Sequence, residues 1–265
     1  MFDCGDAIAA DITYGKPSKT SGKNAASAIE AAVHACYTGK AAAMVTAPVS
    51  KEALHSAGYH FPGQTEMIAL LSRSQRHAMM LVSNKIRVGL LTIHLPISEV
   101  ASSISKDKIL DKLEIVHETL KFRYNIKHPK IALLALNPHA GENGVIGPEE
   151  NSMYAEAIAE ALKKEIVVEG PFPADGYFGT GKYKKYDATL ASYHDQGLIP
   201  MKMLSFDSGV NYSAGLNVIR TSPDHGTAYD IAGKNKANAK SMIEAIKLAI
   251  KFATAKKPVP NKTER

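Results

Sequence analysis

The run KIALLALNPH, residues 130–139, indicates the fold class. It is apolar without the polar alternation of a half-exposed strand, so it predicts a strand that is buried on both faces. Helical patterns lie on either side of it, at 105–124 and at 147–165. Pro148 and the two glutamates after it suit the first turn of the second helix.

The same alternation of apolar strands and amphipathic helices runs through most of the chain. Further strands are predicted at 42–49, 77–83, 87–95 and 186–194, and further helices at 24–39, 66–74 and 238–255. Buried strands that alternate with helices are typical of an α/β protein with a mostly parallel sheet.

Composition excludes several classes of protein. The 265 residues are 45% hydrophobic and 22% charged, as in soluble globular chains. No apolar run approaches the roughly 20 residues that span a bilayer, and no signal region follows Met1, so we expect a cytoplasmic protein without a membrane partner.

The net charge is +6, but the basic residues are scattered, which argues against a nucleic-acid partner. Cys4 and Cys36 form no CxxC motif and predict free thiols.

Three predicted strands end near a histidine: His94, His139 and His194. Because open α/β sheets bind ligands at the carboxyl ends of their strands, we expect these imidazoles to converge on one crevice. Each histidine alone is more compatible with a packed or surface role than with metal binding. For three histidines at equivalent strand ends, a shared metal site and such ordinary roles are about equally compatible with the sequence. Neutral imidazoles suit Zn, Co, Ni or Mn. Asp195 either orients the His194 ring or has a structural role in the turn.

Anion-binding residues are expected near the same crevice. Gln64 and Thr65 lie at a predicted helix N-terminus, where backbone N–H groups attract phosphate or carboxylate. Two cations and an amide follow the third histidine: Lys202, Asn211 and Arg220. Each of these residues alone is compatible with an ordinary surface position. Together they predict a pocket for a phosphorylated or carboxylated polyol.

Several long motifs, in order and across nearly the whole chain, resemble the 4-hydroxythreonine-4-phosphate dehydrogenase family of vitamin B6 biosynthesis. They are TIHLPISEVASSI, NPHAGENGVIGPEE, PFPADGYF, YHDQGLIPMK and GVNYSAGLNVIRTSPDHGTAYDIAG. The last loop is also similar to the adenosine-binding loop of isocitrate and isopropylmalate dehydrogenases. The resemblance implies their two-lobed, mostly parallel α/β fold. Residues 1–55 with 200–265 would form the nucleotide side, and 56–199 the metal and dimer side.

The resemblance also implies a homodimer with a shared active site. A divalent metal (Zn, Mg, Mn or Co) would be held by His94, His139 and His194, drawn from both subunits. Substrate contacts would come from Gln64, Thr65, Lys202, Asn211 and Arg220. The adenosine part of NAD, or alternatively NADP, would lie against His225, Gly226, Thr227 and Asn238. Lys202 and Asp175 match active-site positions, and Lys202 is placed to assist proton transfer.

The activity implied is the metal- and NAD-dependent oxidation, with decarboxylation, of 4-phosphohydroxy-L-threonine to 3-amino-2-oxopropyl phosphate in pyridoxal 5'-phosphate biosynthesis. A metal on the hydroxyl lowers its pKa, so that hydride leaves more readily, and it stabilises the charge left by carbon dioxide. The alternatives are a dehydrogenase of 4-phosphothreonate or 4-phosphoerythronate, a metal-dependent hydrolase or lyase, and an inactive truncated remnant. A hydrolase would need the histidines but not the HGTAYDIAG loop.

Two features depart from the family pattern. Gly63-Gln64-Thr65-Glu66 stands where the family carries Gly-His-Thr-Glu, so the side chain at position 64 cannot become a cation. The change indicates weaker contact with an anion or a different preferred substrate. The family's opening strand and Gly-Asp-Pro loop also have no counterpart here, and we therefore expect the family's N-terminal segment to be lacking.

Overall fold

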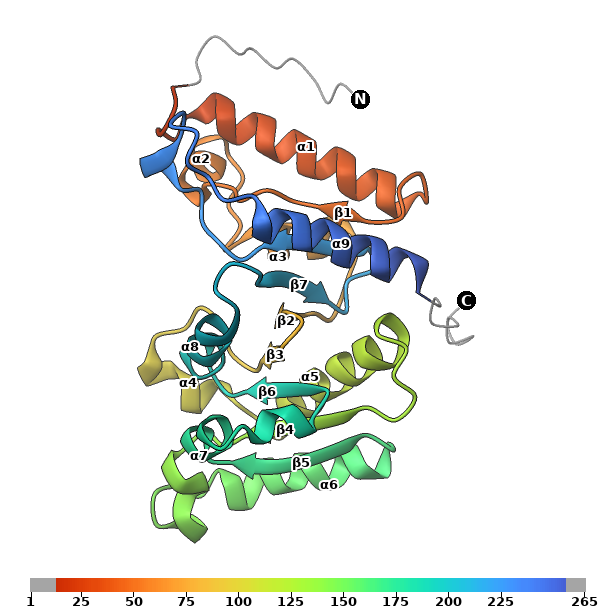
Figure 1. Ribbon diagram of the computed structural model, residues 1–265, viewed down its shortest axis with the longest axis vertical. Coiled ribbons are helices and arrows are strands. Elements are labelled where there is room, and N and C mark those ends of the chain that lie inside the picture. The colour runs from red at the N-terminus through yellow and green to blue at the C-terminus, as the bar shows by residue number, and fades with distance from the viewer. Residues whose placement is uncertain (1–12, 256–265) are drawn as a thin grey trace. The chain divides into compact units, whose positions relative to one another are not determined.

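The computed structural model describes residues 13–255, which form two compact units (Figure 1). Within these residues, unit 1 takes 13–77 and 205–250, and unit 2 takes 78–204 and 251–255. The lobe boundaries expected near residues 55 and 199 therefore fall at 77 and 204. The first boundary moves because the helices that follow residue 50 pack within unit 1.

Unit 1 combines three short strands with helices. Its strands are β1 (Met44–Val45), β7 (Val210–Ala214) and β8 (Arg220–Pro223), and its helices are α1 (Lys19–Tyr37), α2 (Lys51–Ser56), α3 (Gln64–Leu71) and most of α9 (Lys240–Thr254). The strand order is β1-β8-β7. β1 runs parallel to β8, pairing Met44 with Arg220, whereas β7 is antiparallel to β8.

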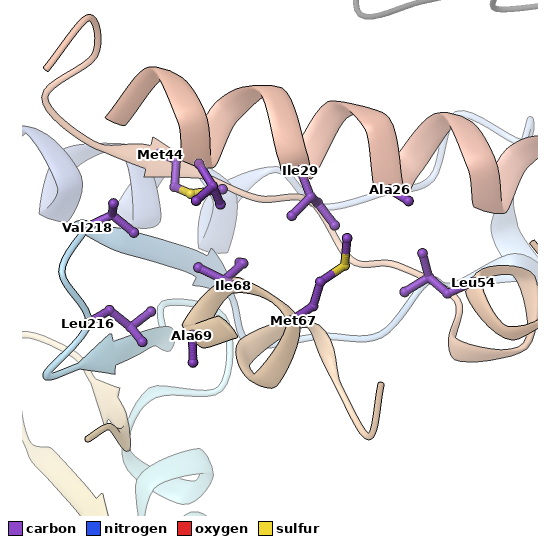
Figure 2. Packing of buried hydrophobic residues seen from close by; sticks show 10 residues of the cluster. Ala26, Ile29, Met44, Leu54, Met67, Ile68, Ala69, Leu216 and Val218 are labelled. Atoms are coloured by element: carbon purple, nitrogen blue, oxygen red, sulfur yellow. The ribbon is translucent and has the colours of Figure 1, made fainter. Parts of the chain in front are cut away.

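The core of unit 1 lies between α1 and the elements below it. Ser18 begins α1 with a capping box, in which its hydroxyl accepts from the N–H of Ser21. Figure 2 shows Ala26 and Ile29 of α1 pointing toward Met67 of α3 and Leu54 of α2. These apolar side chains are at least 95% buried, so their removal from water holds α1, α2 and α3 together.

Unit 2 is built on five strands in the order β2-β3-β6-β4-β5 (Figure 1). They are β2 (Ala78–Val82), β3 (Arg87–Leu90), β4 (Lys130–Leu134), β5 (Val167–Phe172) and β6 (Ala188–Ala191). Only the β2–β3 pair is antiparallel in this unit. Its longer helices are α4 (Ile97–Ser103), α5 (Lys106–Glu118), α6 (Ala155–Lys163), α7 (Ala174–Gly179) and α8 (His194–Ser205).

The predicted α/β class with a mostly parallel sheet is confirmed, with differences in detail. The strand predicted at 42–49 shortens to β1, and the strand predicted at 87–95 ends at Leu90. The structure also has three strands that were not predicted, β5, β7 and β8. Polar residues interrupt these strands, and β5 contains a glycine and a proline, so their apolar pattern is weak.

Cys36 is a free thiol, and partial burial raises its pKa, whereas Cys4 lies outside the described residues. In the part of the chain described by the structure, the helices are all too short or too polar to cross a membrane.

The close approach of α1 to α2 generates a stability prediction. A Cβ added at Gly22 would lie 1.9 Å from the carbonyl oxygen of Ala53. We therefore expect Gly22→Ala to lower the free energy of unfolding by about 1–3 kcal/mol, because the backbones must separate. Denaturant unfolding followed by circular dichroism measures the change. Gly176→Ala is the control, since space around that helical glycine is open; equal stability of the two variants would contradict the packing.

Candidate active site

His94 and His194 come together at the carboxyl ends of two neighbouring strands of unit 2. β3 and β6 pair in parallel, with Leu90 opposite Ala191, and each histidine follows within four residues of its strand. The two ring centroids are 5.9 Å apart. Imidazoles that bind one metal at about 2.0–2.1 Å have centroids roughly 5–6 Å apart. The pair therefore fits two positions of a shared metal site.

Asp195 is hydrogen-bonded to one nitrogen of His194. Its Oδ1 lies 2.6 Å from His194 Nδ1, where an Nδ1–H donates to the carboxylate, so Nε2 is the nitrogen that faces away from this contact. A carboxylate behind a histidine is the usual partner of a metal-binding imidazole, because it holds the ring and raises its basicity. This contact favours the orienting role of Asp195 over a purely structural one.

Buried and partly buried hydrogen bonds join the strand ends near these histidines. Gln196 accepts from the N–H of Ser192 at 2.7 Å and donates to the carbonyl of Ala135 at 2.7 Å, which links the ends of β6 and β4. Thr92, just after β3, donates to the carbonyl of Ser192 at 2.8 Å. The edge that carries the histidines is therefore cross-linked and rigid.

His139 lies in an unusual loop after β4. Residues 139–143 all have positive φ, between 43° and 74°, and four of these five are not glycine. Each such residue costs roughly 1–2 kcal/mol relative to right-handed backbone. Within residues 13–255, no three histidine, cysteine or acidic side chains are placed together to hold a metal. The single chain thus brings together two of the three predicted ligands, His94 and His194.

A second polar cluster surrounds Arg220 in unit 1. The Arg220 side chain is 3% exposed and donates to four neutral side-chain oxygens. The distances are 3.0 Å to Thr46, 3.0 Å to Ser213 and 3.4 Å to Thr65, and the fourth acceptor is Oε1 of Gln64. The predicted residues Gln64, Thr65 and Arg220 are therefore neighbours, since α3 begins beside the β1–β8 pair.

Among the described residues, no anion is hydrogen-bonded to the positive charge of Arg220. Burial lowers the pKa of Arg220 to about 10, and the charge of Glu66 opposes that shift, so the guanidinium stays protonated at neutral pH. A buried cation among neutral acceptors favours an anionic ligand. The amide of Gln64 is used within the protein, because its oxygen also accepts from Thr46 at 3.0 Å and its nitrogen donates to Ala47 at 3.4 Å.

The remaining predicted site residues are dispersed over both units. Asn211 is on β7, and its buried Oδ1 has no hydrogen-bond partner within residues 13–255. Such an unpaired acceptor is typical of a binding position. Lys202 is exposed on α8, and Asp175 is exposed in the first turn of α7.

The predicted nucleotide loop is exposed and follows β8. His225, Gly226, Thr227 and Asn238 all face solvent. The Nδ1 of His225 lies 2.9 Å from the carbonyl of Gly226, and the side chain of Asn238 accepts from the N–H of Lys240 at the start of α9. Asn238 therefore also caps that helix.

The predictions omitted Ser213, which shares Arg220, and Gln196, which joins the strand ends. The threonine of the run VTAPVSK, Thr46, was considered an anion-binding candidate at a strand end, but its contact with Arg220 was not predicted. The partners of Ser213 and Gln196 are distant in the sequence, so only the folded chain identifies them.

The chain is similar to several known proteins. The family model of the pyridoxal phosphate biosynthetic protein PdxA matches residues 2–249. A 4-hydroxythreonine-4-phosphate dehydrogenase of Trichlorobacter lovleyi is 46% identical over 248 residues, which is 93% of this chain and 74% of the relative. A putative D-threonate 4-phosphate dehydrogenase of Oceanobacillus iheyensis is 42% identical over 252 residues, 95% of this chain and 76% of the relative.

Among solved structures, the 4-hydroxythreonine-4-phosphate dehydrogenase of Klebsiella pneumoniae has a TM-score of 0.84 and 40% identity, covering 92% of this chain and 73% of that one. The resemblance noted in the sequence is thereby confirmed. Because the family model spans nearly all of the chain and the relatives exceed 40% identity, this chain belongs to the PdxA family of pyridoxal phosphate biosynthetic proteins.

Proposed function

We propose that the chain is a metal- and NAD-dependent dehydrogenase that oxidises and decarboxylates 4-phosphohydroxy-L-threonine to 3-amino-2-oxopropyl phosphate. The observation that carries the proposal is the pair of His94 and His194 rings, 5.9 Å apart, with Asp195 behind one of them. The names of the relatives at 40–46% identity support the same activity.

His94, His194 and His139 would hold the divalent metal, with His139 and the pair drawn from different copies of a homodimer. A metal bound there supplies a Lewis acid that lowers the pKa of the substrate hydroxyl and stabilises the charge left as carbon dioxide departs. Asp195 keeps the His194 ring in position. Lys202 is the candidate for proton transfer to or from the substrate, and Asp175 is a second active-site candidate.

Arg220 would bind the phosphate or carboxylate of the substrate. Its charge is buried and its hydrogen bonds go to neutral oxygens, so an anion gains more there than at an exposed arginine. Thr65 and the unpaired Oδ1 of Asn211 would add neutral contacts to the substrate. Gln64 would act mainly by holding Arg220, since its own amide is already bonded within the protein.

The exposed loop of His225, Gly226, Thr227 and Asn238 would carry the adenosine part of NAD, with NADP as the alternative. Its position directly after β8 supports this role, because nucleotides bind at strand ends in α/β proteins. The proposal places the enzyme in the cytoplasm, where thiols such as that of Cys36 stay reduced.

The central prediction concerns metal-dependent turnover. Purified protein with NAD and 4-phosphohydroxy-L-threonine should form NADH, and chelation should abolish the reaction until a divalent metal is returned. His194→Ala should reduce turnover at least about 100-fold, because a metal ligand is lost. His128→Ala, at an exposed histidine of the same unit, should leave the rate unchanged.

The same assay separates the alternatives. Preferential turnover of 4-phosphothreonate would assign the chain the activity that the Oceanobacillus iheyensis relative is named for. Preferential turnover of 4-phosphoerythronate would assign it to a related dehydrogenase activity. Chemistry that proceeds without NAD would indicate a hydrolase or lyase. A folded protein that binds metal but turns over none of these substrates would contradict the proposed function.

A further prediction concerns Arg220. Arg220→Lys should raise the KM for the phosphorylated substrate roughly 10–100-fold with a smaller change in kcat, because hydrogen bonds to a charged group contribute about 1.5–3 kcal/mol. Steady-state kinetics on protein shown to be folded by circular dichroism measures the split. Arg73→Lys, at an exposed arginine of unit 1, is the matched control. An unchanged KM in Arg220→Lys would show that this guanidinium does not bind the substrate.

A further inference from the structure

The buried carboxylate of Glu150 is hydrogen-bonded to the loop that carries His139. Glu150 follows the loop and is 3% exposed. It receives two hydrogen bonds from Asn137, the residue that precedes the loop. Oε1 accepts from the backbone N–H of Asn137 at 2.7 Å, and Oε2 accepts from its side-chain Nδ2 at 3.0 Å. One carboxylate thus joins the two ends of the segment 137–150.

Glu150 also lies against the middle of the left-handed turn. A Cβ added at Gly141 would be 2.6 Å from Oε2 of Glu150 and 2.9 Å from the carbonyl oxygen of Gly147. The carboxylate therefore fills the space under Gly141, the third of the five residues with positive φ. It is hydrogen-bonded at the start of the loop, to Asn137, and lies against the centre of the loop, at Gly141.

The burial of Glu150 is costly without a specific role. Among the described residues it forms no ion pair, and its hydrogen-bond donors are neutral groups of a single residue. A carboxylate that is buried in this way is retained where it determines a conformation that the chain would not otherwise adopt. The consecutive left-handed residues 139–143 are such a conformation, because four of them carry a Cβ.

The helical turn that starts at Glu150 also reaches the strand end of His194. It spans Glu150–Tyr154, and the buried hydroxyl of Tyr154 lies 2.7 Å from Oγ of Ser192, two residues before His194. The loop of His139 and the strand end of His194 are therefore connected through one short element whose first and last residues are buried.

We propose that Glu150 is a positioning residue whose carboxylate holds the left-handed turn of residues 139–143 and thereby determines how His139 is presented to the metal. The inference rests on the proposed metal-binding role of His139. Glu150 acts only through the loop and does not itself contact metal or substrate. A neutral residue of the same shape would place an N–H₂ group against the donors of Asn137 and release the turn.

Titration of the metal-free protein with Co²⁺, followed by visible absorption, tests this inference without relying on activity. Glu150→Gln should bind Co²⁺ about 10–100-fold more weakly and show a changed d–d spectrum, while keeping the wild-type far-ultraviolet circular dichroism. Glu149→Gln is the matched control. Its carboxylate is half-buried and accepts one bond from Asn137, at 2.8 Å, so its effect should be much smaller.

His139→Ala, alone and combined with Glu150→Gln, separates positioning from general stabilisation. If Glu150 acts through His139, the double variant should bind Co²⁺ no more weakly than His139→Ala alone. Wild-type affinity and spectrum in a folded Glu150→Gln variant would overturn the inference, as would fully additive losses in the double variant. Wild-type Co²⁺ binding by His139→Ala would instead refute the proposed metal role of His139 itself.

Discussion

The parallel register between β3 and β6 is the constraint on which the candidate metal site depends. Because Leu90 lies opposite Ala191, the segments that leave the two strands emerge side by side and bring His94 and His194 together. The hydrogen bonds of Thr92 and Gln196 then hold these segments to each other and to the end of β4. Any change that shifts this register would move one ring away from the other.

The two units contain different kinds of polar site. Unit 2 presents two imidazoles at a strand edge, with Asp195 setting the orientation of one ring. Unit 1 buries a guanidinium among hydroxyl and amide oxygens and leaves its charge for an anion. The proposed oxidation of a phosphorylated hydroxy acid would use a Lewis acid and an anion-binding group. The family to which the chain belongs is described as pyridoxal phosphate biosynthetic.

Strain in the loop of His139 is the second notable feature of unit 2. Left-handed backbone over five residues persists only where the surrounding groups determine it. Here the groups are Asn137 and Glu150, together with glycine at 141, where no side chain would fit. The consequence is local: the left-handed turn places His139 where regular strand or helix geometry would not.

The amino-acid sequence by itself determined the α/β class, the helices α1, α3, α5, α6 and α9 but not α8, and the residue types of the candidate site. Apolar runs without alternation and histidines after three of them are readable without coordinates, because both depend on local order along the chain. Gln64, Thr65 and Arg220 were also predicted as site residues from the sequence, mostly through the resemblance. Their mutual contacts were not, since the two segments are more than 150 residues apart.

Only the tertiary structure decided which of these residues meet and what supports them. It showed that β3 ends before His94 and that two of the three histidines pair within the chain. It also showed that Thr46 and Ser213 accept hydrogen bonds from Arg220, and that Glu150 accepts one from Asn137 before the loop of His139. Strands β5, β7 and β8 were also established only there, because their polar residues, and the glycine and proline of β5, obscure the apolar pattern. The physical reason is the same in each case: hydrogen bonds and packing between distant segments depend on chain direction and register, which local sequence does not encode.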